Sequence, residues 1–351
     1  MRRRFLQSAI LPALFSALFS SLLLSDVTRA GTLQVLPIAG RAYGVDGNNV
    51  VGATAISHLG FLYDGSTYSP ISPPGATGST AYGIAGNRIV GVYDDASFNP
   101  HGFLYDGVSY TTLDHPLGAQ GTFPHSLFGH TVVGSYIDAA AKAHGFAYDG
   151  SSWTTIDDPL GVKGTTVAGI SGNKIVGTYI DAKNRTHGFL YNGSTYTTLD
   201  DPSVSGATNS FTSPNGIWSN TVVGQAFNGL SGFGFVYDGS TFTHPFGTSS
   251  NLPGVNSLSF SFTGISGNTI VGYYRDFPSG IDHPIIYTIP EPGSLLLAAS
   301  AAVGAALAAA RRAKARRDGQ HRAYVRIARR RECNVYPALR CAGSRLRSGL
   351  G

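Results

Sequence analysis

The chain has 351 residues, of which 46 are Gly and 13% are charged, and its formal net charge is +5. Abundant Gly with short apolar runs favours an all-β protein rich in turns. The charge is uneven, because residues 31–292 carry 8 Lys and Arg against 17 Asp and Glu. Nucleic-acid binding needs a basic face on the folded part, so we exclude that function for this region.

Residues 1–30 have the pattern of an export signal peptide. Arginines at positions 2–4 precede an apolar stretch over residues 5–24, and residues 28–30 match a small-x-small cleavage site. The start also resembles a twin-arginine signal, so Sec export and twin-arginine export both stay open. Either route takes the chain out of the cytoplasm.

A block of about 43 residues recurs six times after this leader, a period typical of a propeller blade. Each block contains four candidate strands. Examples are a short Gly-containing strand at residues 168–170, Ile-Val-Gly-x-Tyr at 175–179, Gly-Phe-Leu-Tyr at 102–105 and Tyr-Thr-Thr-Leu at 196–199. Gly-Asn and Asp-Gly pairs between them predict tight hairpins. The repeated Gly predicts a crowded axis, and the aromatic residues predict packing between blades.

The two ends of the repeat array are complementary. The sixth block lacks a fourth strand, because residues 285–287 run directly into the next segment, and residues 33–36 align with a fourth strand. We therefore predict that residues 31–289 form a six-bladed β-propeller closed by its N-terminal strand, which leaves no open edge. A right-handed β-solenoid is the alternative fold.

Two polar features recur in the long loops, which the predicted topology gathers on one face of the disc. Function on a rigid scaffold tends to lie in such loops, so this is the candidate binding face. The candidate residues are His101, His144, His187, Asp157, Asp158, Asp200 and Asp201.

One His per blade is too widely spread for a shared metal, which favours a structural hydrogen bond. Asp before Pro is common turn chemistry, with calcium binding and acid–base catalysis as alternatives. We therefore assign no catalytic residue, no metal and no cofactor, and calcium stays open.

A second targeting signal follows the repeats. Pro290, Glu291 and Pro292 precede an apolar run over residues 295–310 and a basic cluster over residues 311–317. This order resembles the PEP-CTERM sorting signal of Gram-negative bacteria. The resemblance implies a C-terminal transmembrane helix that anchors the chain transiently in the inner membrane. It also implies processing by an exosortase, a membrane protease, and delivery to the cell surface or the extracellular matrix. A plain single-span anchor is the alternative.

The last 34 residues, 318–351, depart from that family's pattern, since such chains stop at the arginine cluster. This basic tail has no clear period, and we expect it to be disordered. It is either a cytoplasmic extension or the product of a misplaced stop codon.

The repeated signatures resemble the bacterial extracellular HAF repeat, with Gly in the middle place at Gly102, Gly145 and Gly188. The resemblance implies an exported repeat protein and supplies no catalytic residues. The only cysteines, Cys333 and Cys341, follow the repeats, so the repeat region has no disulfide.

These features predict a non-enzymatic, surface- or matrix-associated propeller that binds extracellular polysaccharide or a surface protein. The rival function is an extracellular hydrolase or lyase that uses the axial pocket, and a purely structural matrix role is a third. An enzyme should place non-repeating His, Asp, Glu or Arg around the axis. The one Glu in residues 31–292 is Glu291, in the sorting motif.

Overall fold

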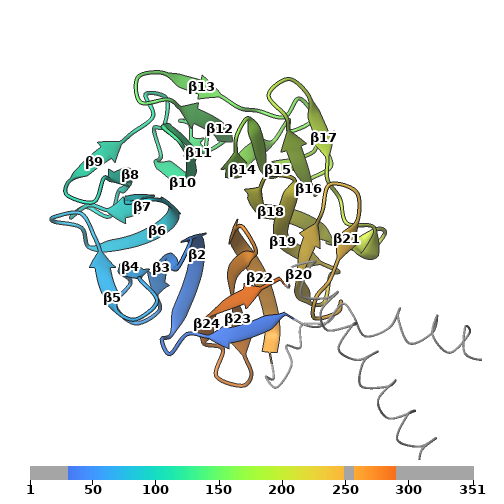
Figure 1. Ribbon diagram of the computed structural model, residues 1–351. Helices are drawn as coiled ribbons and strands as arrows, with labels where there is room; N and C mark the ends of the chain where they lie inside the picture. The colour runs from blue at the N-terminus through green and yellow to red at the C-terminus, as the bar shows by residue number, and fades with distance from the viewer. Residues whose placement is uncertain (1–30, 249–256, 290–351) are drawn as a thin grey trace, which may run out of the picture. The chain divides into compact units, whose positions relative to one another are not determined.

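The structure is a computed structural model that describes residues 31–248 and 257–289. These residues form six four-stranded antiparallel sheets arranged around a central axis (Figure 1). The six-bladed β-propeller predicted from the repeats is confirmed, and the solenoid alternative is wrong. In blades 1 to 5, consecutive strands pair from the axis outward.

Blade 1 contains β2 (Gly40–Asp46), β3 (Asn49–Thr54), β4 (Gly60–Tyr63) and β5 (Tyr68–Ile71). Blade 2 contains β6 (Gly78–Ala85), β7 (Arg88–Asp94), β8 (Pro100–Tyr105) and β9 (Tyr110–Leu113). Blade 3 contains β10 (Thr122–Phe128), β11 (Thr131–Ile137), β12 (Ala143–Tyr148) and β13 (Trp153–Thr155).

Blade 4 contains β14 (Gly164–Ser171), β15 (Lys174–Ile180), β16 (Thr186–Tyr191) and β17 (Tyr196–Thr198), and a short 3-10 helix, η2 (Pro202–Val204), follows it. Blade 5 contains β18 (Phe211–Trp218), β19 (Thr221–Phe227), β20 (Gly232–Tyr237) and β21 (Phe242–Thr243). Blade 6 contains β22 (Ser257–Ser266), β23 (Thr269–Asp276), β24 (Asp282–Thr288) and β1 (Thr32–Val35).

The turns have the chemistry that the sequence predicts. The turn between β14 and β15 places Gly172 at φ +62°, in the left-handed region that favours glycine. The turn between β8 and β9 begins with Asp106, whose carboxylate accepts the backbone N–H groups of Val108 and Ser109. These hydrogen bonds hold the pKa of Asp106 below its ordinary value. Both kinds of tight turn lie on the same face of the disc, because successive strands in a blade are antiparallel.

The inner strands begin earlier than the sequence pattern predicted. β14 starts at Gly164, four residues before the predicted strand at 168–170, and pairs from Gly164↔Ile180 onward. The first half of this strand carries Thr165 and Thr166 and lacks the Gly-Ile pair that marks its second half. The loop before it is therefore shorter than expected, and so is the loop before β18, which starts at Phe211.

The N-terminal strand closes the ring. β1 pairs antiparallel with β24, with Leu33 opposite Tyr287 and Val35 opposite Ile285, and the blue strand lies beside the orange strands in Figure 1. The Leu36 backbone N–H then donates to the Pro284 carbonyl at 3.0 Å. The predicted closure by residues 33–36 is confirmed, and it gives the last blade the four strands that the other blades have.

Glycine in the second strand makes room for an aromatic ring of the third. Gly91 pairs with Phe103, and a Cβ on Gly91 would lie 2.8 Å from that ring and 2.0 Å from the Thr80 carbonyl oxygen. Phe103 is fully buried, as are its equivalents Phe146 and Phe189 in the next two blades. The repeated Gly therefore serves strand packing inside each blade as well as packing at the axis.

A ring of small residues lies where the inner strands approach each other most closely. Its members are Gly44, Gly83, Ser126, Gly169, Gly216 and Gly264, one per blade. A Cβ on Gly264 would lie 2.5 Å from the Tyr43 carbonyl oxygen, and one on Gly83 would lie 2.8 Å from that of His125. Both obstacles are backbone atoms of the next blade, so neither can move aside alone.

Several predicted segments lie outside the described residues. They are the signal peptide 1–30, the sorting motif Pro290, Glu291 and Pro292, the apolar run 295–310 and the tail 318–351. Within the described ranges, no helix has the length and apolar character needed to cross a membrane. The predicted C-terminal helix therefore stays a prediction.

We expect Gly264→Ala to lower the free energy of unfolding by about 1–3 kcal/mol, since the added methyl group meets the backbone of blade 1. Ser126→Ala is the matched control, because that ring position already carries a Cβ. Urea denaturation of the two variants measures the difference. Equal urea midpoints for the two variants would show that the axis accommodates the added methyl group without strain.

Deletion of Thr32–Val35 should lower the melting temperature and promote self-association. The deletion leaves β24 with an unpaired edge that can pair with another chain. Scanning calorimetry and size-exclusion chromatography measure the two effects. A monomeric variant with the parent melting temperature would contradict the closure.

Candidate functional site

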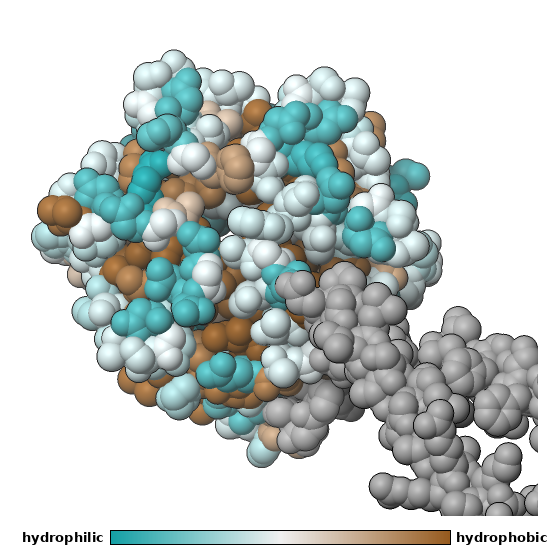
Figure 2. Space-filling view, viewed as in Figure 1, coloured by the Kyte–Doolittle hydropathy of each residue, from teal (hydrophilic) through white to brown (hydrophobic). Residues whose placement is uncertain are grey.

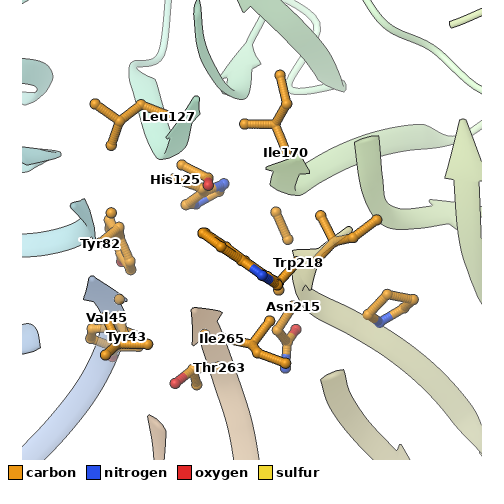
Figure 3. A pocket seen from close by; sticks show the side chains of 18 of the residues that line it. Tyr43, Val45, Tyr82, His125, Leu127, Ile170, Asn215, Trp218, Thr263 and Ile265 are labelled. Atoms are coloured by element: carbon orange, nitrogen blue, oxygen red, sulfur yellow. The ribbon is translucent and has the colours of Figure 1, made fainter. Parts of the chain in front are cut away.

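A cavity of about 550 Å³ occupies the axis of the propeller (Figure 3). Its volume is within the range of small-molecule sites. Its walls are mainly the second halves of the six inner strands and the ends that lead into the first tight turns, together with Thr178, Gln225 and Tyr273 of the second strands. The cavity therefore faces the side of the disc that carries the tight turns, opposite the long loops.

A β-bulge in each inner strand adds one residue to this wall. The register shifts by one residue in every blade, immediately before the ring of small residues. The added residues are Tyr43, Tyr82, His125, Ala168, Asn215 and Thr263, and all of them line the cavity. Bulges re-aim side chains and are common beside functional sites. The bulge residues differ in type from blade to blade, whereas the residue after each of them is Gly in five blades and Ser126 in blade 3.

Aromatic side chains fill one side of the ring. Tyr43 and Tyr82 lie with ring centroids 4.9 Å apart, and the imidazole of His125 meets Tyr82 edge-on at 5.0 Å. Burial, followed by the neighbouring Tyr43, raises the pKa of Tyr82 to about 12. Burial also raises the pKa of Tyr43, although Arg41 opposes the shift. Both phenols are therefore neutral at physiological pH.

His125 is held in one tautomer. Its Nδ1 lies 2.7 Å from the Val167 carbonyl oxygen of the next blade, so Nδ1 carries the proton and donates it. Burial lowers the pKa of His125, and the hydrogen bond to Val167 only partly offsets this effect. The neutral imidazole thus leaves Nε2 as an acceptor, and Nε2 has no hydrogen-bonding partner among the described residues.

Amide side chains lie on the other side of the ring, in blade 5. The Asn215 amide nitrogen donates to the Phe262 carbonyl at 2.8 Å, and its oxygen accepts the Ser213 hydroxyl. The Gln225 amide nitrogen donates to the Phe260 carbonyl at 3.2 Å. These bonds join blade 5 to blade 6 and fix the amides on the cavity wall.

Two aromatic residues stand at the mouth of the cavity. Trp218 is 42% exposed and Phe128 is 45% exposed, and the indole of Trp218 extends into the opening in Figure 3. Asp46 is the one Asp among the lining residues, which include no Lys, Arg or Glu. Its carboxylate accepts the Gly86 backbone N–H at 2.7 Å. The wall is thus aromatic and almost uncharged.

The predicted histidines lie at the opposite face, each held by aspartates of its own blade. His144 Nδ1 lies 2.6 Å from Asp157, and its Nε2 lies 3.3 Å from Asp138. The imidazole stacks on Tyr136 with centroids 5.1 Å apart. His144 therefore joins the loop after strand 2 to the segment after strand 4.

The same arrangement recurs in blades 2 and 4. His101 lies 2.8 Å from Asp114, and His187 lies 2.7 Å from Asp200. The hydrogen bond with Asp114 raises the pKa of His101 above its ordinary value. None of these histidines lines the axial cavity.

The second aspartate of each predicted pair is buried. Asp158 accepts the Leu160 backbone N–H, and burial raises its pKa. Asp201 is 1% exposed and lies 2.7 Å from Nε2 of His244, which follows β21. Burial opposes the charge on Asp201, but the hydrogen bonds from His244 and Ser203 outweigh it and lower its pKa. Thus Asp157 and Asp200 hold the histidines of the third strands, Asp201 holds His244, and Asp158 binds the backbone of its own loop.

Across the described ranges, no cluster of three His, Cys, Asp or Glu side chains is arranged to hold a metal ion. Calcium binding by the predicted aspartates stays a prediction.

The repeat pattern did not predict the ring of bulge residues. One signal could have revealed it, because the position before the repeated Gly-Ile, Gly-Val or Ser-Leu pair varies from Tyr to His, Ala, Asn and Thr between blocks. The position two residues after it is Val, Ile or Leu in every block.

No protein-family model and no curated protein sequence matches the chain. Solved structures share its architecture. The β-propeller domain of the Trilobed protease from Pyrococcus furiosus is 9% identical, with a TM-score of 0.43 over 74% of this chain and 83% of that one. Trypanosoma rangeli sialidase is 12% identical, with a TM-score of 0.44 over 75% of this chain and 56% of that one. The six-bladed fucose-binding lectin of Aleuria aurantia is 12% identical, with a TM-score of 0.39 over 74% of this chain and 99% of that one. These likenesses concern the fold alone.

We expect Asp114→Asn to lower the pKa of His101, because the carboxylate is the main group that raises it. A raised pKa in the folded state stabilises the protein below the unfolded-state pKa of about 6.5 and is lost as the pH rises through the folded-state value. The stability difference between parent and variant should therefore be largest in mild acid. NMR titration of the His101 ring protons measures the shift, and an unchanged pKa would contradict the pairing.

Proposed function

We propose that this protein is an exported, surface- or matrix-associated propeller that binds extracellular material in its axial cavity without chemical turnover. The single observation that carries the proposal is the ring of bulge residues. The tight turns and the Gly of each second strand repeat because every blade needs them, whereas these six residues differ in type where they face one shared space. A difference at positions that line one cavity supports a role for that wall as a whole.

The chemistry of the wall supports binding over catalysis. Two-carboxylate hydrolysis needs a pair of Asp or Glu across the substrate, and the lining residues include Asp46 alone. The described ranges contain no Glu at all. Aromatic faces with fixed amides and hydroxyls instead provide orientation and contact area for a bound molecule.

The export and sorting part of the proposal rests on the sequence segments that flank the propeller. The leader at residues 1–30 would take the chain out of the cytoplasm, and the Pro-Glu-Pro motif would direct it to an exosortase. Extracellular polysaccharide or another surface protein would then be the partner.

One observation favours the rival function, a hydrolase or lyase that acts on polysaccharide. His125 is a neutral imidazole with Nε2 directed away from its Val167 partner, which is the protonation state that a general base requires. The rival enzyme would use His125 as that base within the same cavity.

The two functions differ in whether product forms. We expect the purified full-length chain to sediment with matrix polysaccharide and to release no reducing ends or unsaturated sugars from it. His125→Ala serves as the discriminating variant. Product release by the parent protein that stops in this variant would establish the enzyme and overturn the binding role.

A further inference from the structure

We propose that the axial cavity receives a neutral sugar residue at the end of a glycan chain, which enters from the face that carries the tight turns. The inference deepens the binding role proposed above and rests on it. It names the class of ligand, the side of entry and the residue that makes the main contact, Trp218.

The charge of the wall selects against acidic sugars and phosphates. An anionic ligand needs Lys or Arg, and none lines the cavity, whereas Asp46 stands at its rim. His125 and the two tyrosines are neutral at physiological pH, for the reasons given above. A uronic acid, a sulfated sugar or a phosphate would therefore lose its hydration without gaining an ion pair.

The aromatic wall suits the apolar face of a sugar ring. Trp218 holds its indole in the opening with 42% of its surface exposed, so the face of the ring is accessible to a ligand at the mouth of the cavity. A pyranose presents a flat face of C–H groups that can lie against an indole. Tyr82 and His125, from neighbouring blades, meet edge-on at 5.0 Å and bound the space beside it.

The polar groups suit sugar hydroxyls, which both donate and accept. His125 Nε2 can accept a hydroxyl proton, since its Nδ1 is committed to Val167. The Gln225 nitrogen is committed to Phe260, which leaves its carbonyl oxygen as a second acceptor. Both groups are held by backbone carbonyls of the next blade, so their orientation is fixed before a ligand arrives.

A quaternary ammonium group is the competing ligand class, because aromatic rings near an acidic residue can form a cation cage. The geometry disfavours it. The guanidinium of Arg41 lies over the Tyr273 ring at 4.5 Å, so this aromatic face already has a cation. Arg41 is itself paired with Asp282 at 2.6 Å. That face of Tyr273 is therefore occupied and cannot bind a quaternary ammonium group.

The side from which the ligand enters follows from where the lining residues lie between the two faces of the disc. The lining residues lie toward the tight turns, where Trp218 and Phe128 border the opening. Figure 2 shows hydrophilic and hydrophobic residues interspersed over the face in view, with neither kind forming a continuous field. An internal segment of a polymer cannot enter an axial hole sideways, so the ligand is the end of a chain.

Trp218 is also a built-in reporter for the test. The chain has two Trp, and the second, Trp153, lies stacked on Tyr148 in the outer part of blade 3. Trp153→Phe leaves Trp218 as the single indole. Titrations use this full-length variant in a detergent without a sugar headgroup. The ligands are methyl glucoside, methyl galactoside, methyl mannoside, glucuronate and choline.

We expect at least one neutral glycoside to shift the Trp218 emission with a saturable curve, and glucuronate and choline to leave it unchanged. For the affinity of that glycoside, calorimetry compares Trp218→Ala with Phe98→Ala, whose exposed Phe lies on the opposite face. Loss of the indole should weaken binding by at least about tenfold, because the stacking contact disappears. Phe98→Ala should bind like the parent protein.

The remaining outcomes separate the two proposals. Tight binding of glucuronate or choline that requires Trp218 overturns the neutral-sugar class and leaves the axial binding role standing. Neutral-glycoside binding that survives Trp218→Ala, or no binding of any neutral glycoside, overturns this inference. Failure to sediment with any polysaccharide, in the earlier experiment, overturns the binding role itself.

Discussion

The close approach of the six inner strands at the axis is the constraint on which the molecule depends. Gly264 and Gly216 let neighbouring backbones come together where a Cβ would lie 2.5 Å and 3.0 Å from atoms of the next blade. Because these residues have no side chains, the ring of inner strands is narrow and the backbone of each blade packs directly against the next. The bulges beside the glycines then turn one longer side chain per blade toward the axis, and the cavity wall results.

The sequence predicted the parts of the structure that repeat. Strands such as β15 and β16 are evident because the same aromatic, Gly and turn residues recur in each block, and residues 33–36 stand out as the missing fourth strand. The first half of β14 has no such signature, so its start was placed too late. A bulge residue such as His125 is a single position within a strand. Its meeting with Tyr82 depends on two separate blades converging, which no local pattern records.

The predicted histidines and aspartates illustrate how repetition indicates a role. His144 and Asp157 recur in neighbouring blades because each blade must hold its own loops together, and the structure shows these contacts within the blade. The residues of a shared site need not repeat from blade to blade, since each of them makes a different contact in the same cavity. In a propeller, the positions that vary between otherwise similar blades are therefore the informative ones.

The pairing of β1 with β24 has a consequence for how the protein reaches its final state. These strands come from opposite ends of the repeat array, so their contact is among the longest-range in the chain and is entropically slow to form. Until the last block has been synthesised, the earlier blades form an arc that cannot close. Only a chain that carries both β1 and β24 can therefore close the ring, so a truncated chain is left with an open propeller whose exposed strands can pair with other chains.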